Sequence, residues 1–219
     1  MIMSESNLKF NLSTTANHKV DVMFLADATG SRQLAMDNVK TNILSAYKKF
    51  KTQVTWDVKI GIAFYRDQSD VTPFKVLQTI TGDADKIQNA ANKLVADGGG
   101  DRPEGQMAAL TMFASRSVAG WRPGSTRIIA WFGDEPGHNP VVYNGISYSL
   151  SGAIESLLER NVQVCAFSVS PSNRLDETGQ ATAITESADG VLTNQYVQYN
   201  VKQAGVVDFI FNFIQGDTP

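Results

Sequence analysis

Three nearly continuous apolar segments constrain the fold of this chain most strongly, residues 20–26, 126–132 and 162–169. Each has the length of a β-strand, and the lack of alternating polar residues is typical of strands covered on both faces. Stretches with helical spacing of apolar residues separate them. This alternation predicts an α/β fold with three layers (α/β/α) and a doubly wound, mostly parallel sheet.

Shorter segments complete the pattern. Residues 75–80 follow the strand-like segment 56–65 closely, so we expect an antiparallel edge strand paired as a hairpin across the 67–73 loop. The predicted strands are residues 20–26, 56–65, 75–80, 126–132, 162–169 and 191–193. The predicted helices are residues 31–50, 83–94, 104–115, 147–161, 177–188 and 205–215. Ligands of such folds gather at the carboxyl ends of the strands.

One domain is the expectation for 219 residues. Residues 1–17 are polar and predict an N-terminal arm or short edge strand, and residues 18–219 form the domain itself. No apolar run approaches the ~20 residues of a membrane helix, so no membrane span is expected. Cys165 lies in an apolar strand and is expected to be a small core side chain.

Net charge and the first residues of the sequence bear on the partner and on the compartment. The formal net charge is -3 and the basic residues are scattered, which disfavours nucleic acid as a partner. The first residues lack the basic, apolar and small-residue order of a signal peptide, so we expect a cytoplasmic protein or an excised domain of a larger one.

Hard oxygen donors gather in three loops, and the clearest loop reads Asp27-Ala-Thr-Gly-Ser31 directly after the first strand. The side chains of Asp27, Thr29 and Ser31 alternate along this turn, so one carboxylate and two hydroxyls can point into one concavity. Such oxygens suit Mg²⁺, with Mn²⁺ and Ca²⁺ as alternatives. A second interpretation is that Asp27 and Ser31 only cap the following helix.

The three loops together resemble the metal-ion-dependent adhesion site of von Willebrand factor type A (vWA) domains, in its D-x-T-G-S variant. Gly-Gly-Gly-Asp-Arg-Pro-Glu at 98–104 is similar to the family's G-G-G-D-x-P-E segment, and Gly-Asp-Glu-Pro-Gly-His at 133–138 to its T-D-x-P-x-H segment. The resemblance covers roughly residues 20–215 and implies a Rossmann-like vWA fold. The metal-site residues it implies are Asp27, Thr29, Ser31, Asp101 and Asp134.

The middle loop departs from the family pattern, because the family commonly supplies a threonine there and the nearest oxygens here belong to Asp101 and Glu104. Asp101 is the candidate by resemblance, and both residues also fit the start of a helix. Gly133 stands where the family has threonine, and Arg32 where this variant has methionine. His138 is expected to form a hydrogen bond within its own loop, and Glu135 to be exposed or structural.

The resemblance implies a binding module and not an enzyme. The domain would hold Mg²⁺ with one coordination position left for an acidic side chain of a protein partner, in adhesion or in complex assembly. Trp121, Tyr143 and Tyr148 lie in or beside predicted loops and are candidates for the recognition surface. One alternative is a Mg²⁺-dependent phosphoryl-transfer enzyme with Asp27 as nucleophile. Another is a structural or oligomerising vWA domain with a vestigial metal site.

Overall fold

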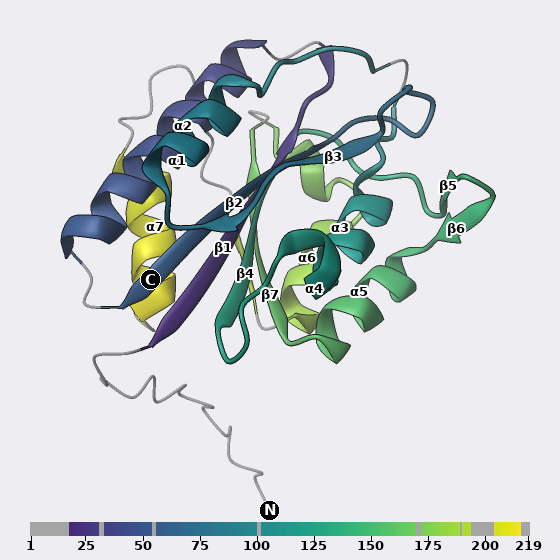
Figure 1. Ribbon diagram of the computed structural model, residues 1–219. Helices are drawn as coiled ribbons and strands as arrows, with labels where there is room; N and C mark the ends of the chain where they lie inside the picture. Colours follow the sequence, from purple (N-terminus) through teal and green to yellow (C-terminus); the bar gives the residue numbers. More distant parts are fainter. Residues whose placement is uncertain are drawn as a thin grey trace, which may run out of the picture.

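A computed structural model describes residues 18–30, 33–53, 56–99, 102–169, 172–188, 190–193 and 204–215. The core of this part of the chain is a six-stranded sheet in the order β3-β2-β1-β4-β7-β8 (Figure 1). The strands are β1 (Lys19–Asp27), β2 (Asp57–Tyr65), β3 (Phe74–Thr81), β4 (Thr126–Gly133), β7 (Val162–Ser168) and β8 (Val191–Thr193).

The pairing of the strands confirms the predicted fold class. β1 pairs in parallel with β2 and β4, and β7 pairs in parallel with β4 and β8. Only β3 runs antiparallel in this sheet, on the outer side of β2, as its short segment predicted. All five parallel strands therefore end at one edge, which holds the residues that follow β1, β2 and β4.

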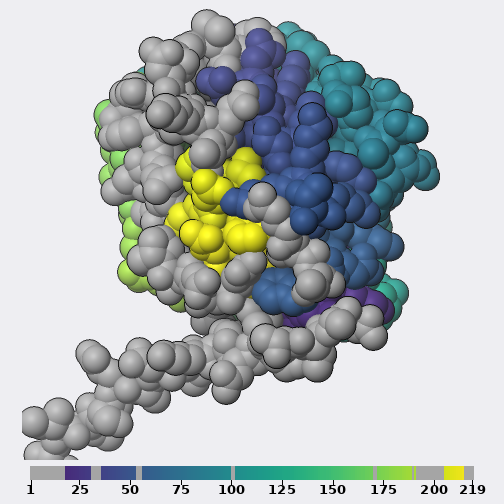
Figure 2. Space-filling view, turned by 90° about the vertical axis from the view of Figure 1, so that its left-hand side faces the viewer, coloured from purple at the N-terminus to yellow at the C-terminus, as the bar shows by residue number. Residues whose placement is uncertain are grey.

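Helices cover both faces of the sheet (Figure 1). One face carries α1 (Gln33–Gln53), α2 (Ala84–Asn92) and α7 (Ala204–Gln215), and Figure 2 shows α7 at the surface next to α1. The other face carries α3 (Gln106–Ala114), α4 (Arg116–Ala119), α5 (Leu150–Glu159) and α6 (Gln180–Ser187). A 3-10 helix, η2 (Arg174–Asp176), lies between β7 and α6. None of the described helices is long and apolar enough to cross a membrane.

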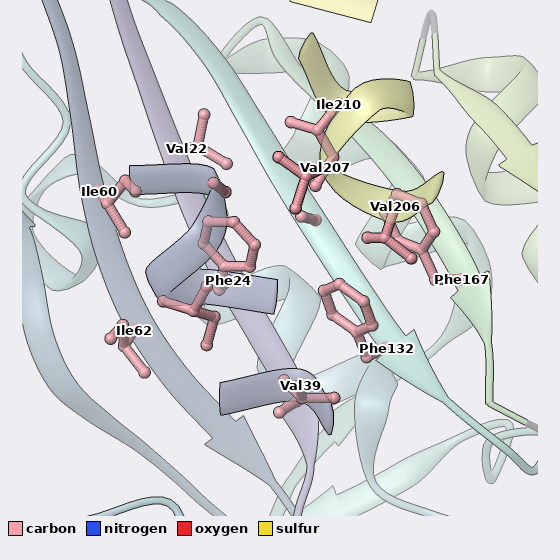
Figure 3. Close-up of a cluster of buried hydrophobic side chains, with 14 of the residues drawn as sticks. Val22, Phe24, Val39, Ile60, Ile62, Phe132, Phe167, Val206, Val207 and Ile210 are labelled. Atoms are coloured by element: carbon pink, nitrogen blue, oxygen red, sulfur yellow. The ribbon is translucent and has the colours of Figure 1, made fainter. Parts of the chain in front are cut away.

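Aromatic packing in the core fixes the strand ends that carry the site. Phe132 of β4 stacks on Phe24 of β1 and Phe167 of β7, with ring centroids 6.2 and 4.8 Å apart. Figure 3 shows Phe132 below Val206 and Val207 of α7, with Phe24 and Phe167 on either side. Burial of one such side chain contributes ~1.5–3 kcal/mol, so the three central strands are held firmly in register. Cys165 is also fully buried, as expected.

A second, two-stranded sheet was not predicted. β5 (Val141–Tyr143) and β6 (Ile146–Tyr148) form a hairpin, and the expected helix over 147–161 begins only at Leu150, where Ser149 caps it. The turn is Asn144-Gly145, and both residues have positive φ angles. An Asn-Gly pair between short strands is a strong hairpin signal, so the sequence did contain the information.

Candidate metal centre

Acidic side chains lie at the carboxyl ends of three neighbouring strands. Asp27 is the last residue of β1, Asp67 follows β2 by two residues, and Asp134 comes directly after β4. The register places Ala26 beside Phe132, so the loops that follow β1 and β4 leave the sheet side by side. The predicted loops therefore do meet at one edge.

The turn after β1 presents the Asp27 carboxylate inward. The backbone nitrogen and the hydroxyl of Thr29 both donate to Asp27 Oδ1, at 3.0 and 2.8 Å. Asp27 Oδ2 is buried, and no N–H or hydroxyl donor of a described residue bonds to it. Gly30 N donates to Gly98 O at 2.9 Å, and a Cβ at Gly30 would lie only 2.9 Å from that oxygen. Glycine at position 30 thus allows the turn to lie against the middle loop.

Glu104 is the side chain that the middle loop brings to this edge, and sequence reasoning did not select it. Its backbone pairs with the loop after β4: Glu104 N donates to Pro136 O, and His138 N donates to Glu104 O, at 3.0 and 2.9 Å. The predicted helix began at Glu104, but the helix in the structure, α3, begins at Gln106, so Glu104 lies before its first turn. Its side chain is buried, and Oε2 has no hydrogen-bond partner among the described residues.

These carboxyl groups destabilise one another's charged forms. Burial, and next the charge of Asp134, raises the pKa of Asp27 to about 7. Burial also raises the pKa of Glu104 to about 9, with further contributions from Asp27, Asp67, Asp134 and Asp70. Without a cation, the site therefore tends to hold protons at neutral pH.

A contrasting carboxylate lies at the other end of β1. Asp21 is completely buried, yet it accepts hydrogen bonds from Arg122 N and Nε and from Ser125 Oγ, at 2.7, 2.6 and 2.8 Å. The fold thus supplies a counter-ion and donors where a buried carboxylate is only structural. Asp27 and Glu104 each keep an oxygen without such a partner, which fits a site for a cation.

The donor set suits a hard divalent cation, because carboxylate and hydroxyl oxygens predominate. Asp27, Thr29, Asp134 and Glu104 are the described residues that would hold it, some directly and others through water. Within the described ranges, no three acidic, histidine or cysteine side chains are close enough to ligate one ion by themselves. Hydroxyl and water oxygens would complete the shell. Ser31 and Asp101, the other two predicted residues, lie outside the described residues, and their roles remain predictions.

Two neighbouring side chains, His138 and Trp121, depart from their predicted roles, and Glu135 fits one of its two. His138 Nε2 lies 3.2 Å from Asp67 Oδ1, so it bonds to the β2–β3 loop and not within its own loop. Trp121 is buried, with Nε1 donating to Phe113 O at 2.9 Å, and is not a recognition residue. Glu135 is buried and ion-paired, which confirms a structural role and excludes an exposed one.

Glycine stands at position 133, where the family has threonine, because Tyr65 occupies the space that a side chain at this position would need. A Cβ at Gly133 would lie 2.3 Å from Tyr65 Oη and 2.8 Å from Leu175 Cδ1. Tyr65 Oη accepts from Trp131 Nε1 at 3.1 Å and lies 3.4 Å from Phe132 O. Burial, and next the charge of Asp27, raises the pKa of Tyr65 well above its ordinary value. A neutral tyrosine hydroxyl thus fills the space that a side chain at position 133 would need.

This packing predicts that Gly133→Ala lowers the free energy of unfolding by about 2 kcal/mol, because the methyl group overpacks a closed space. Urea denaturation of the parent and variant measures the change. The double variant Gly133→Ala, Tyr65→Phe should recover part of the loss, since it removes the nearest atom. A single variant as stable as the parent would contradict this account of position 133.

A doubly wound sheet with an acidic centre at the carboxyl end of β1 is the architecture of a vWA domain. The chain belongs to the vWA-like family of integrin beta-like proteins A to E, whose family model matches residues 3–139. The chain is also similar to the alpha-protein kinase vwkA of Dictyostelium discoideum, at 25% identity over 138 residues. That match covers 63% of this chain and only 21% of the kinase.

Solved structures confirm the fold. BatB of Bacteroides thetaiotaomicron matches with a TM-score of 0.65 and 14% identity, over 90% of this chain and 99% of BatB. Proximal thread matrix protein 1 of the mussel byssus matches with a TM-score of 0.62 and 14% identity, over 89% of this chain and 48% of the matrix protein. The pilus adhesin SpaC of Lactobacillus rhamnosus GG matches with a TM-score of 0.61 and 12% identity, over 90% and 30%.

Proposed function

We propose that this domain is a non-catalytic protein-binding module that depends on a divalent cation, with Mg²⁺ as the first candidate. The observation that carries the proposal is the meeting of Asp27, Asp134 and Glu104 at one sheet edge, where two of their buried oxygens lack partners among the described residues. A bound cation would supply a positive charge for Asp27 and Glu104, which have no ion pair among the described residues. One coordination position would accept an acidic side chain of a partner protein.

The family and its relatives support a binding role. Membership of a vWA-like family indicates a protein-interaction module. SpaC is described as a pilus adhesin, and the byssus protein as a thread matrix protein. The relative vwkA is a kinase, but this chain spans only about a fifth of it, so its kinase activity gives no argument for catalysis here.

Thermal melting in Mg²⁺, Mn²⁺, Ca²⁺ or EDTA tests the metal. A ligand at ~100 times its dissociation constant adds ~2.7 kcal/mol of stability, which raises the melting temperature by roughly 5–10 °C for a domain of this size. We expect such a rise for the parent and none for Asp134→Ala. Asp85→Ala, which removes an exposed acid on α2, should keep the response. A parent that no cation stabilises would contradict the proposal, and phosphatase activity lost in Asp27→Ala would favour the enzyme instead.

A further inference from the structure

Two arginines from different loops converge on one buried carboxylate beside the metal centre. Arg174 of η2 and Arg102 of the middle loop each place Nη2 near Glu135 Oε1, at 2.5 and 3.0 Å. The Glu135 side chain is only 6% exposed, whereas those of Arg174 and Arg102 are 26% and 58% exposed. Gln106 Nε2 donates to Glu135 O at 3.0 Å and holds its backbone in place. Both arginines therefore form ion pairs with a carboxylate that is held in place.

This arginine pair borders the proposed cation site directly. Asp134 and Glu135 are consecutive, and Arg174 Nη2 lies 3.9 Å from Asp134 Oδ2. Because Asp134 would also contribute to the cation site, a partner group that reaches the cation comes close to the Arg174 guanidinium. The positive side chains thus lie at the rim of an otherwise acidic centre.

A bound cation would change the charge balance at this rim. Two carboxylates, Glu135 and Asp134, face the two guanidinium groups, and a cation that takes up the charge of Asp134 would leave Glu135 alone to neutralise both. A guanidinium carries five N–H donors. The Arg102 side chain is 58% exposed, so donors of its guanidinium group other than the one that faces Glu135 are accessible to a partner. Spare positive charge and spare donors in a planar fork are what a carboxylate ligand requires.

We propose that Arg102 and Arg174 form an anion subsite that binds a second carboxylate of the partner, next to the carboxylate that completes the cation's coordination. This inference rests on the proposed function and narrows its partner to a segment with two acidic side chains close together. In an extended segment, residues i and i+2 point to the same side, so an acidic pair at that spacing can reach both groups. A partner with a single acid would use only the cation.

Short labelled peptides test this inference by fluorescence anisotropy. The probe is acetyl-Gly-Asp-Gly-Asp-Gly-amide, and two matched peptides each replace one aspartate by asparagine. With Mg²⁺ we expect the parent to bind the two-acid peptide at least about tenfold more tightly than either one-acid peptide. EDTA should abolish the binding of all three peptides.

The arginine variants separate this subsite from the cation site. Arg102→Gln should weaken the two-acid peptide about fivefold, the loss expected for a partly exposed charge pair, and leave the one-acid peptides unchanged. Arg102→Lys keeps the charge but loses the fork, and should give an intermediate loss. Arg116→Gln makes the same charge change on α4 at the opposite edge of the sheet and should have no effect. Because Arg102 is exposed, unchanged melting temperatures should confirm that its variants fold.

The outcomes distinguish the two proposals. Equal binding of the three peptides in Mg²⁺, or an equal effect of Arg102→Gln on all of them, would overturn the anion subsite alone, and the arginines would then only neutralise Glu135. Absence of any Mg²⁺-dependent binding would overturn the carboxylate-binding function and this inference with it.

Discussion

Asp27→Asn is expected to stabilise the metal-free domain and to abolish its response to Mg²⁺. The pKa of Asp27 rises from an ordinary 3.8 to about 7 through burial and the charge of Asp134. The charged form is therefore costly in the fold near pH 8. Asparagine keeps an oxygen that can accept from Thr29 N and Oγ1 but carries no charge. One pKa unit corresponds to ~1.4 kcal/mol, so we expect a gain on the order of 3 kcal/mol in EDTA.

Chemical denaturation with EDTA and with Mg²⁺ measures both effects. Asp21→Asn is a matched control, because it makes the same change on the same strand at a carboxylate that Arg122 and Ser125 already satisfy. Asp21→Asn should destabilise the domain by about 2 kcal/mol and keep the Mg²⁺ response. If Asp27→Asn instead lost stability in EDTA, Asp27 would be an ordinary structural carboxylate and helix cap.

Local sequence patterns were sufficient for the sheet and for part of the site. Continuous apolar segments predict buried parallel strands, and residues that directly follow such strands must lie at the same edge. Asp27 and Thr29 could therefore be selected without coordinates, and the resemblance to vWA domains added Asp134. The hairpin at Asn144-Gly145 also has a local sequence signal, the Asn-Gly pair. It was missed because residues 147–161 were assigned to a helix from their apolar periodicity.

Glu104 could not be selected in this way because its position depends on contacts between distant segments. Locally, Pro103-Glu104 fits the first turn of a helix. In the fold, backbone hydrogen bonds to Pro136 and His138 hold Glu104 in place. The Gln180 side chain in turn bonds to the backbone N–H and C=O of Gly137, between these two residues. The arginines around Glu135 likewise come from loops far apart in the sequence. Spacing within one loop carries no information about such pairings.

Glu104→Gln is expected to remove most of a pH dependence that the metal-free domain should show. The pKa values of Glu104 and Asp27, about 9 and about 7, lie above the ordinary carboxyl range, so the folded state binds protons more tightly than the unfolded state. Stability is then fully present below about pH 4 and is lost as the pH rises through about 9. Each pH unit costs up to ~1.4 kcal/mol per group, which gives up to roughly 6 kcal/mol between pH 5 and 8, about 4 kcal/mol of it from Glu104.

Denaturation in EDTA across this pH range measures the dependence. Glu104→Gln stays neutral and should leave only the smaller dependence due to Asp27, whereas Glu155→Gln, an exposed change on α5, should leave the curve as in the parent. A parent curve that is flat or rises towards pH 8 would contradict the electrostatics of the site.

The same variant identifies the ligand from the middle loop. A cation must displace protons from Glu104 and Asp27, so Mg²⁺ should stabilise the parent more near pH 8 than near pH 6. If Glu104 supplies the ligand, Glu104→Gln weakens Mg²⁺ binding at least about tenfold, the scale of losing one supporting group at a metal site, and Asp101→Asn weakens it far less. The opposite order would assign the role to Asp101, as the sequence resemblance implied, and would leave Glu104 as a buried acid that only tunes the charge of the site.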